Sequence, residues 1–189
     1  DGYEATRRLR LLAEMNVEVN REILLNEDIE LIYRTILDYL FQLFKNVSTG
    51  SILIVDDDGN LRFSAWRGFT DDYAKNFCLK LEESFLFQDT NGRPTETRLI
   101  EQATIQRMLT RFDPGDWQYK SVISAPLFMG DRIFGLLNLD SDHAGTFNAD
   151  DAHTVERFRN QIEVGLLARE RYRTSIERSH LDALTGLFT

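Results

Sequence analysis

Polar side chains alternate with apolar ones on three strand-like segments of the sequence. Because successive residues of a strand point to opposite faces, one side of 133–140 carries Asn138 and Asp140, while the other side is aliphatic. An apolar wall with a few directed polar groups is typical of a small-molecule site, so we predict a ligand pocket here. The candidate pocket residues on the three segments are Ser64, Trp66, Val122, Ser124, Phe134, Leu136, Asn138 and Asp140.

A structural role for the two most polar candidates is an equal alternative. Asn138 and Asp140 stand at the end of a strand, where side-chain oxygens and amides commonly form hydrogen bonds with neighbouring loops.

Other chemistries find little support in the residue types. The single cysteine, Cys78, cannot close a disulfide within the chain and is interpreted as a buried apolar thiol. His143, His153 and His180 lack the spacing of metal ligands, so no metal site is predicted and the cofactor stays unknown. A net charge of −9 opposes nucleic-acid binding, and no apolar run is long enough for a membrane span. These features favour a cytoplasmic protein.

Two helical segments carry apolar residues at three- and four-residue steps, which favours pairing of two chains in a coiled coil. Asn16 occupies an inward position of the first segment, where a polar residue often fixes register, although a surface helix with a chance asparagine is the alternative. The candidate dimer-interface residues are Leu9, Leu12, Asn16, Val19, Ile23, Val155, Phe158 and Ile162.

The intervening residues predict an antiparallel sheet. Residues 51–67 form a hairpin around an Asp-Gly turn, 121–140 form a second hairpin, and a long helix follows Asn148. Together with a helix that starts after Asn26, this order predicts an α+β fold. Its N- and C-terminal helices pack on one face of the sheet, and crossover loops and short helices form a pocket on the other.

Several pieces of this pattern resemble the GAF domain family. The second hairpin, SVISAPL followed by RIFGLLNLDS and then FNADD, matches in order and spacing, and GSILIVDDDGNLRFSAWRG at 50–68 resembles the first GAF hairpin. The resemblance covers about residues 26–170 and implies a small-molecule-binding, dimerising sensor.

The last residues resemble a second family. LDALTGLFT at 181–189 looks like the opening of a GGDEF diguanylate cyclase domain. The two resemblances imply three parts: an N-terminal signalling helix (1–25), a GAF sensory domain (26–170), and an output helix with the start of a GGDEF domain (171–189). They imply a homodimer that controls an attached cyclase in response to an unidentified small molecule. The chain itself contains no catalytic domain and is expected not to be an enzyme.

Three other functions are considered within the GAF resemblance. A ligand-free dimerisation spacer would have a pocket filled by its own side chains. A free methionine sulfoxide reductase needs a set of cysteines that can form a disulfide, and Cys78 alone cannot form one. In addition, Asn138 replaces one carboxylate of that family's pocket. Cyclic-nucleotide binding is disfavoured because Ser141 and Asp142 stand where that group has an Asn-Lys pair.

Overall fold

The computed structural model describes residues 2–110 and 118–186. The helices are α1 (Gly2–Leu25), α2 (Ile29–Leu43), α3 (Asp71–Asn76), α4 (Phe85–Asp89), α5 (Gln102–Leu109) and α6 (Ala149–Thr185), with a 3₁₀ turn at Leu81–Glu83. The strands are β1 (Thr49–Val55), β2 (Asn60–Arg67), β3 (Leu79–Lys80), β4 (Arg98–Leu99), β5 (Ser121–Met129) and β6 (Arg132–Ser141).

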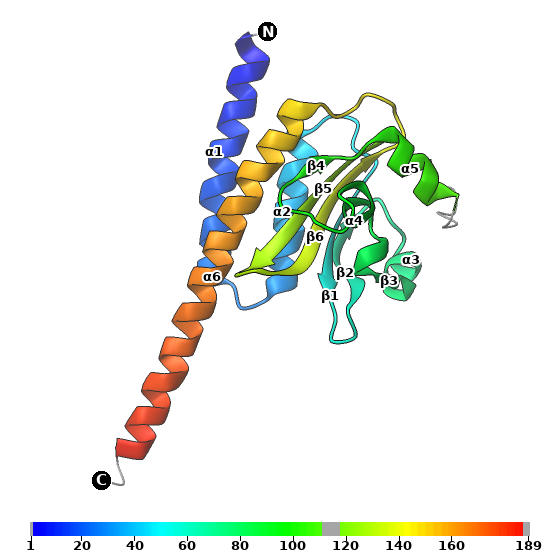
Figure 1. Cartoon of the computed structure of the whole chain (residues 1–189). Helices are drawn as coiled ribbons and strands as arrows, with labels where there is room; N and C mark the ends of the chain where they lie inside the picture. The colour runs from blue at the N-terminus through cyan, green and yellow to red at the C-terminus, as the bar shows by residue number, and fades with distance from the viewer. Residues whose placement is uncertain (1, 111–117, 187–189) are drawn as a thin grey trace.

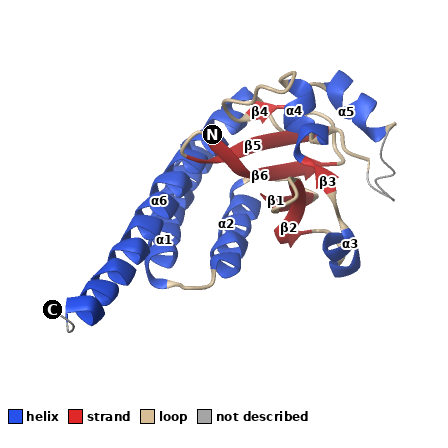
Figure 2. Ribbon diagram, turned by 60° about the horizontal axis from the view of Figure 1, so that its bottom comes forward, coloured by secondary structure: helices blue, strands red, loops and turns tan. Residues whose placement is uncertain are grey.

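The strands form one antiparallel sheet in the order β3-β2-β1-β6-β5-β4. Helices α1, α2 and α6 lie together on one face, and the short helices α3, α4 and α5 lie on the other (Figures 1 and 2). The predicted α+β fold is confirmed, with the flanking helices on one face of the sheet.

Local signals in the sequence set where the two sheet-packing helices begin. The Asp28 side chain caps α2 by accepting hydrogen bonds from the backbone N–H groups of Glu30 and Leu31. At the start of α6, Asn148 and Asp151 each accept a hydrogen bond from the other's backbone N–H, a reciprocal capping box. Asp151 also pairs with Arg8 at 2.7 Å, which ties this cap to α1.

The helix face of the sheet carries the larger of two apolar cores. Aliphatic side chains from α1, α2 and α6 pack there against Ile52, Ile123, Leu137 and Leu139 of the sheet. On the opposite face, Leu53, Leu61, Val122 and Leu136 pack beneath α4 and α5 in a smaller core. The sheet therefore has a larger apolar core on the face covered by α1, α2 and α6, and a smaller core on the face covered by the short helices.

The apolar seam predicted to pair with a second chain is instead used within the chain. Helix α1 folds alongside α2 and α6, so five of the candidate interface residues are at most 3% exposed: Val19, Ile23, Val155, Phe158 and Ile162. Leu12 packs against the same core, Asn16 is half-buried, and only Leu9 is largely exposed. Heptad spacing marks an apolar face equally well whether its partner is another chain or a neighbouring helix.

Helix α6 continues well beyond the sheet as a single helix beside and past α1 (Figure 1). Near the point where it leaves the domain, its Arg169 donates a hydrogen bond to the Glu27 carbonyl at 2.7 Å. From residue 175 to 186 every side chain is exposed. The cyclase-like motif begins on this free helix, but its Leu187 and the two residues after it lie outside the described part of the chain.

Across the described ranges, the structure contains no helix with the length and apolar character that a bilayer crossing requires.

A candidate ligand cavity

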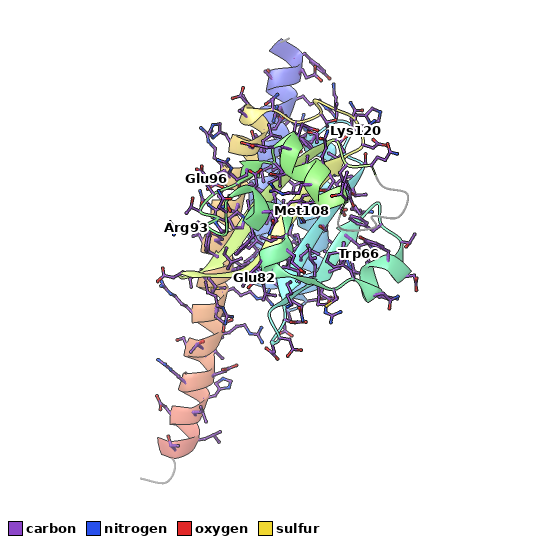
Figure 3. The ribbon with its side chains drawn as sticks, turned by 45° about the vertical axis from the view of Figure 1, so that its right-hand side comes forward. Trp66, Glu82, Arg93, Glu96, Met108 and Lys120 are labelled. Atoms are coloured by element: carbon purple, nitrogen blue, oxygen red, sulfur yellow. The ribbon has the colours of Figure 1, made fainter. Side chains whose placement is uncertain are left out.

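A cavity of about 290 Å³ lies between the sheet and the short helices α3, α4 and α5. Figure 3 shows Met108 of α5 over the sheet, on this side of the fold. The side chains around the cavity come from the central strands and from the segments that cross above them. They are Ser51, Leu53, Phe63, Phe69, Tyr73, Phe77, Cys78, Leu79, Ser84, Phe85, Met108, Leu109, Tyr119, Asn138 and Asp140.

Aromatic rings make up much of the cavity wall. Phe63 of β2 meets Phe77 edge to face with ring centroids 4.9 Å apart, and it meets Phe69 in the same way at 5.0 Å. Phe69 stacks on Tyr73 with an angle of 10° between the ring planes. Phe85 and Tyr119 form a separate edge-to-face pair. These rings present both faces and edges to a bound molecule.

Asp140 is the charged residue of the cavity lining. Its side chain is 4% exposed, and its Oδ2 accepts a hydrogen bond from Thr49 Oγ1 at 3.0 Å. Burial raises the pKa of Asp140 to about 7, because the ionised carboxylate loses hydration that a single hydroxyl donor does not replace. The carboxyl group can therefore gain or lose a proton near neutral pH.

Two phenols share the electrostatic environment of this carboxyl group. Burial raises the pKa of Tyr73 and Tyr119, and the negative charge of Asp140 raises both further. Their hydroxyls are consequently neutral at physiological pH. No lysine, arginine or histidine among the described residues lines the cavity.

Asn138 lies two residues before Asp140 on the same face of β6. Its Oδ1 accepts a 2.5 Å hydrogen bond from Ser124 Oγ on the paired position of β5. This bond fixes the amide so that its oxygen faces the neighbouring strand, which leaves the Nδ2 donor for the cavity. Asn138 and Asp140 thus form hydrogen bonds with neighbouring strands, where loops were the expected partners, and both line the cavity; their contact with a ligand stays a prediction.

The structure places the β2 candidates differently from simple alternation. The β1–β2 pairing shifts between Ile52 and Leu53, which pair with Ala65 and Phe63, so Ser64 is the extra residue of a bulge. Phe63 therefore faces the cavity, whereas Ser64 and Trp66 are absent from its lining. Trp66 lies beside α3 and donates its Nε1–H to Asp71 at 3.2 Å (Figure 3).

A second bulge corrects the assignment of faces at the start of β6. The β5–β6 register shifts between Leu127 and Phe128, so Phe134 packs with the helix-side core and Ile133 with the cavity-side core. Phe134 is consequently not a pocket residue. Val122, Ser124 and Leu136 lie on the expected side, but they form the packed floor beside the cavity and not its lining.

Most of the aromatic wall was missed by strand-based reasoning. Tyr73, Phe77, Phe85 and Tyr119 belong to the segment between the two hairpins, where no clear period is visible. Its density of aromatic residues was the available signal. Cys78, interpreted as a buried thiol, is exposed at the cavity.

An ionic cluster connects α6 to strand β5 and to the chain just before β4. Arg159, which is 5% exposed, binds the carboxylates of Glu156 and Glu163, with Nη1 2.6 Å from Glu163 Oε1. Those carboxylates also accept the backbone N–H groups of Thr97 and Phe128, at 2.7 and 2.8 Å. We call these three side chains the α6 clasp. It fixes α6 to β5 and to the segment that links α4 to β4.

The donors for a metal ion are not brought together in the described ranges, where no group of three histidine, cysteine, aspartate or glutamate side chains could hold one.

Comparisons with known proteins agree with this geometry. Residues 26–166 match the GAF domain family. The structure is similar to the GAF domain of a phosphoenolpyruvate-protein phosphotransferase from Coxiella burnetii, with a TM-score of 0.70 and 16% identity over 90% of this chain and 98% of that one. The corresponding Acinetobacter domain gives 0.67 and 14%, covering 84% and 94%.

Enzymes with this fold are similar as well. A free methionine-R-sulfoxide reductase from Neisseria meningitidis, in complex with its substrate, gives a TM-score of 0.66 and 16% identity over 85% of this chain and 91% of that one. At these identities the likeness shows the fold alone. Comparison with curated proteins gives no match.

Proposed function

Because this chain belongs to the GAF domain family, whose members are typically small-molecule sensors, we propose that it is the sensory domain of a cytoplasmic signalling protein. The ligand binds in the cavity between the sheet and helices α3, α4 and α5. Binding changes the position or stability of α6, and α6 controls an attached diguanylate cyclase domain. The chain itself is not an enzyme.

The observation that carries the proposal is an aromatic-walled cavity joined to a protruding helix. The cavity is not filled by its own side chains, which favours a ligand-binding domain over a ligand-free spacer. Phe85 of α4 lines it, and the chain after α4 leads to Thr97, whose N–H is held by Glu156 of α6. A ligand that moves α4 therefore acts on a segment that α6 holds directly.

The cyclase assignment rests on the motif at the end of the chain and on the free end of α6. A helix whose last three described turns are exposed gains little stability from packing, so it suits a connection to a further domain. The reductase alternative is not favoured, because Cys78 is the only cysteine of the sequence and cannot form a disulfide within the chain.

A second copy of the chain is the proposed partner, through a face other than the one predicted from the heptads. Leu24 and Val164 are each 70% exposed. They lie at similar heights on parallel helices, because Gly165 of α6 is in contact range of Ile23 on α1. Two-fold pairing of this outer face would bring two α6 helices together and so set the relative position of two output domains.

Native mass spectrometry of protein freshly purified from cells tests the ligand proposal. We expect a mass in excess of the polypeptide that is lost on unfolding and is reduced in Phe63→Trp, which fills the cavity. The ligand proposal would be contradicted by two results together: a measured mass equal to that of the polypeptide alone, and no chemical-shift changes in the cavity residues when fragments are screened by NMR.

A further inference from the structure

We propose that the ligand is a small organic cation, an ammonium compound whose charge lies against Asp140 and whose carbon groups contact the aromatic wall. This inference rests on the proposed sensory function and names its ligand class.

The first step of the argument is charge balance. Asp140 lines the cavity with 4% of its surface exposed, and its carboxylate accepts a hydrogen bond from the neutral Thr49 hydroxyl. Such a carboxylate is costly to ionise unless a cation approaches it. No described lining residue is basic, so a ligand that carries a positive charge would supply a countercharge that these residues do not.

The second step is the character of the surrounding wall. The faces and edges of Phe63, Phe69, Tyr73 and Phe77 enclose one side of the cavity, and Tyr73 lies within electrostatic reach of Asp140. Aromatic faces attract desolvated cations, most strongly alkylated ammonium groups that a carboxylate alone would bind weakly. Carboxylate and rings together select a charge that carries apolar substituents.

The third step is what the same geometry disfavours. Phosphates and carboxylates would meet Asp140 with no arginine or lysine among the described lining residues to offset the repulsion. A neutral apolar molecule would leave the carboxyl group buried without a new partner. An organic cation removes the uncompensated charge and still buries the apolar surface.

A matched pair of probes tests the proposal on the whole chain. Choline and 3,3-dimethyl-1-butanol differ by the replacement of the quaternary nitrogen with carbon, and choline carries a charge that does not titrate. Isothermal titration calorimetry at pH 8 should give about tenfold tighter binding of choline. Asp140→Asn should weaken choline binding by about tenfold or more, and it should change the affinity for the alcohol by less than about threefold.

Two further variants separate this effect from misfolding. Asp142→Asn removes an exposed carboxylate outside the cavity lining and should leave both affinities unchanged. Phe77→Leu keeps an apolar wall but removes a ring. It should weaken choline binding by about threefold and have little effect on binding of the alcohol.

A pH series adds an independent readout. Because the pKa of Asp140 is raised to about 7, a proton must leave the carboxyl group before a cation binds. Choline affinity should therefore fall about tenfold per pH unit below that value and level off above it. The other titratable lining groups are Tyr73, Tyr119 and Cys78. Cys78→Ser should preserve the profile.

The outcomes distinguish this inference from the proposed function. Equal or tighter binding of the alcohol, or choline binding that survives in Asp140→Asn, would overturn the cationic ligand. In the first case the cavity would remain a small-molecule site. If neither probe binds, the cationic ligand is also overturned, and the mass-spectrometric experiment then decides separately whether the cavity holds any molecule.

Discussion

At position 140 an aspartate occupies a place that most sheets give to an apolar residue. It lies between Leu139, which packs into the helix-side core, and Ser141, whose hydroxyl binds the Asn46 carbonyl at 2.7 Å. The backbone of Asp140 is fixed as well, because its carbonyl accepts the Ser48 N–H at 2.8 Å. The carboxyl group is thus held at the cavity by the sheet on either side of it.

The pH dependence of stability should report this burial. The folded-state pKa of about 7 lies well above the ordinary aspartate pKa of about 3.9. Between these values the unfolded chain has released a proton that the folded chain retains, so this group's contribution to stability is lost as pH rises from about 4 to 7. Asp140→Asn should remove this loss. From pH 5 to pH 8, the free energy of unfolding of the variant should therefore rise by roughly 2–4 kcal/mol relative to that of the wild type. Urea unfolding of both proteins at pH 5 and pH 8 measures the difference. The same change in unfolding free energy with pH in both proteins would contradict the prediction.

At the scale of elements, the α6 clasp is the polar connection between α6 and the strands. Arg159 also lies over the Phe128 ring, with its Cζ 5.6 Å from the centroid, so its hydrocarbon stem and its charge both have partners. The two carboxylates that it binds hold backbone groups of two different segments. Loss of the arginine would leave Glu156 and Glu163 with their backbone N–H donors but without the cation that pairs with both.

Arg159→Leu should therefore destabilise the domain by about 2–4 kcal/mol, because removal of one partner from a buried ionic cluster leaves uncompensated charge. Arg10→Leu is the matched control: it breaks an ion pair with Glu14 on α1 in which both side chains are at least 50% exposed, and such pairs contribute about 0–1 kcal/mol. Chemical denaturation of the two variants gives the comparison. Similar losses would show that the clasp is no stronger than a surface pair.

For the whole molecule, the proposed pairing of two copies through the exposed side of helices α1 and α6 gives a test of assembly. Replacement of Leu24 and Val164 by glutamate should convert a dimer to a monomer, since four acidic groups would meet at the two-fold axis. Gln42→Glu with Gln106→Glu, at exposed positions on α2 and α5, adds the same charge elsewhere and should leave the dimer intact. Sedimentation velocity measures both, and a dimer that persists in the first variant would place the interface on another face.

Signal transmission along α6 is also a property of the whole molecule. Residues are inserted after Tyr172, where α6 is exposed and insertions leave the domain's packing in place. Two residues rotate the attached domain by about 200°, whereas seven restore the phase to within about 20° and lengthen the helix by ~10 Å. In a protein that carries the proposed cyclase domain after α6, we expect the two-residue insertion to uncouple cyclase output from the ligand state and the seven-residue insertion largely to preserve coupling. Cyclic di-GMP formation measures the output, and equal coupling in both would show that rotational phase carries no signal.

The amino-acid pattern was sufficient to predict the long helices, the two hairpins and their order, but not the short helices and strands between the hairpins. Local patterns are sufficient for this, because alternation, the Asp-Gly turn and the Asn148 cap act over a few residues. These local patterns predicted both long hairpins and the start of α6. They also placed Asn138 and Asp140 on the cavity side of β6, since no bulge interrupts the strand between Leu136 and Asp140.

Which neighbours these elements have depends on packing between residues far apart in the sequence. The bulges opposite Ile52 and Leu127 shift the faces of β2 and β6, and a shift of one residue is invisible in a short apolar run. The partner of α1 is a second such case, because an apolar stripe specifies burial and not which surface covers it. The aromatic wall is the third: its residues come from segments without regular period, and long-range packing alone brings them to Asp140.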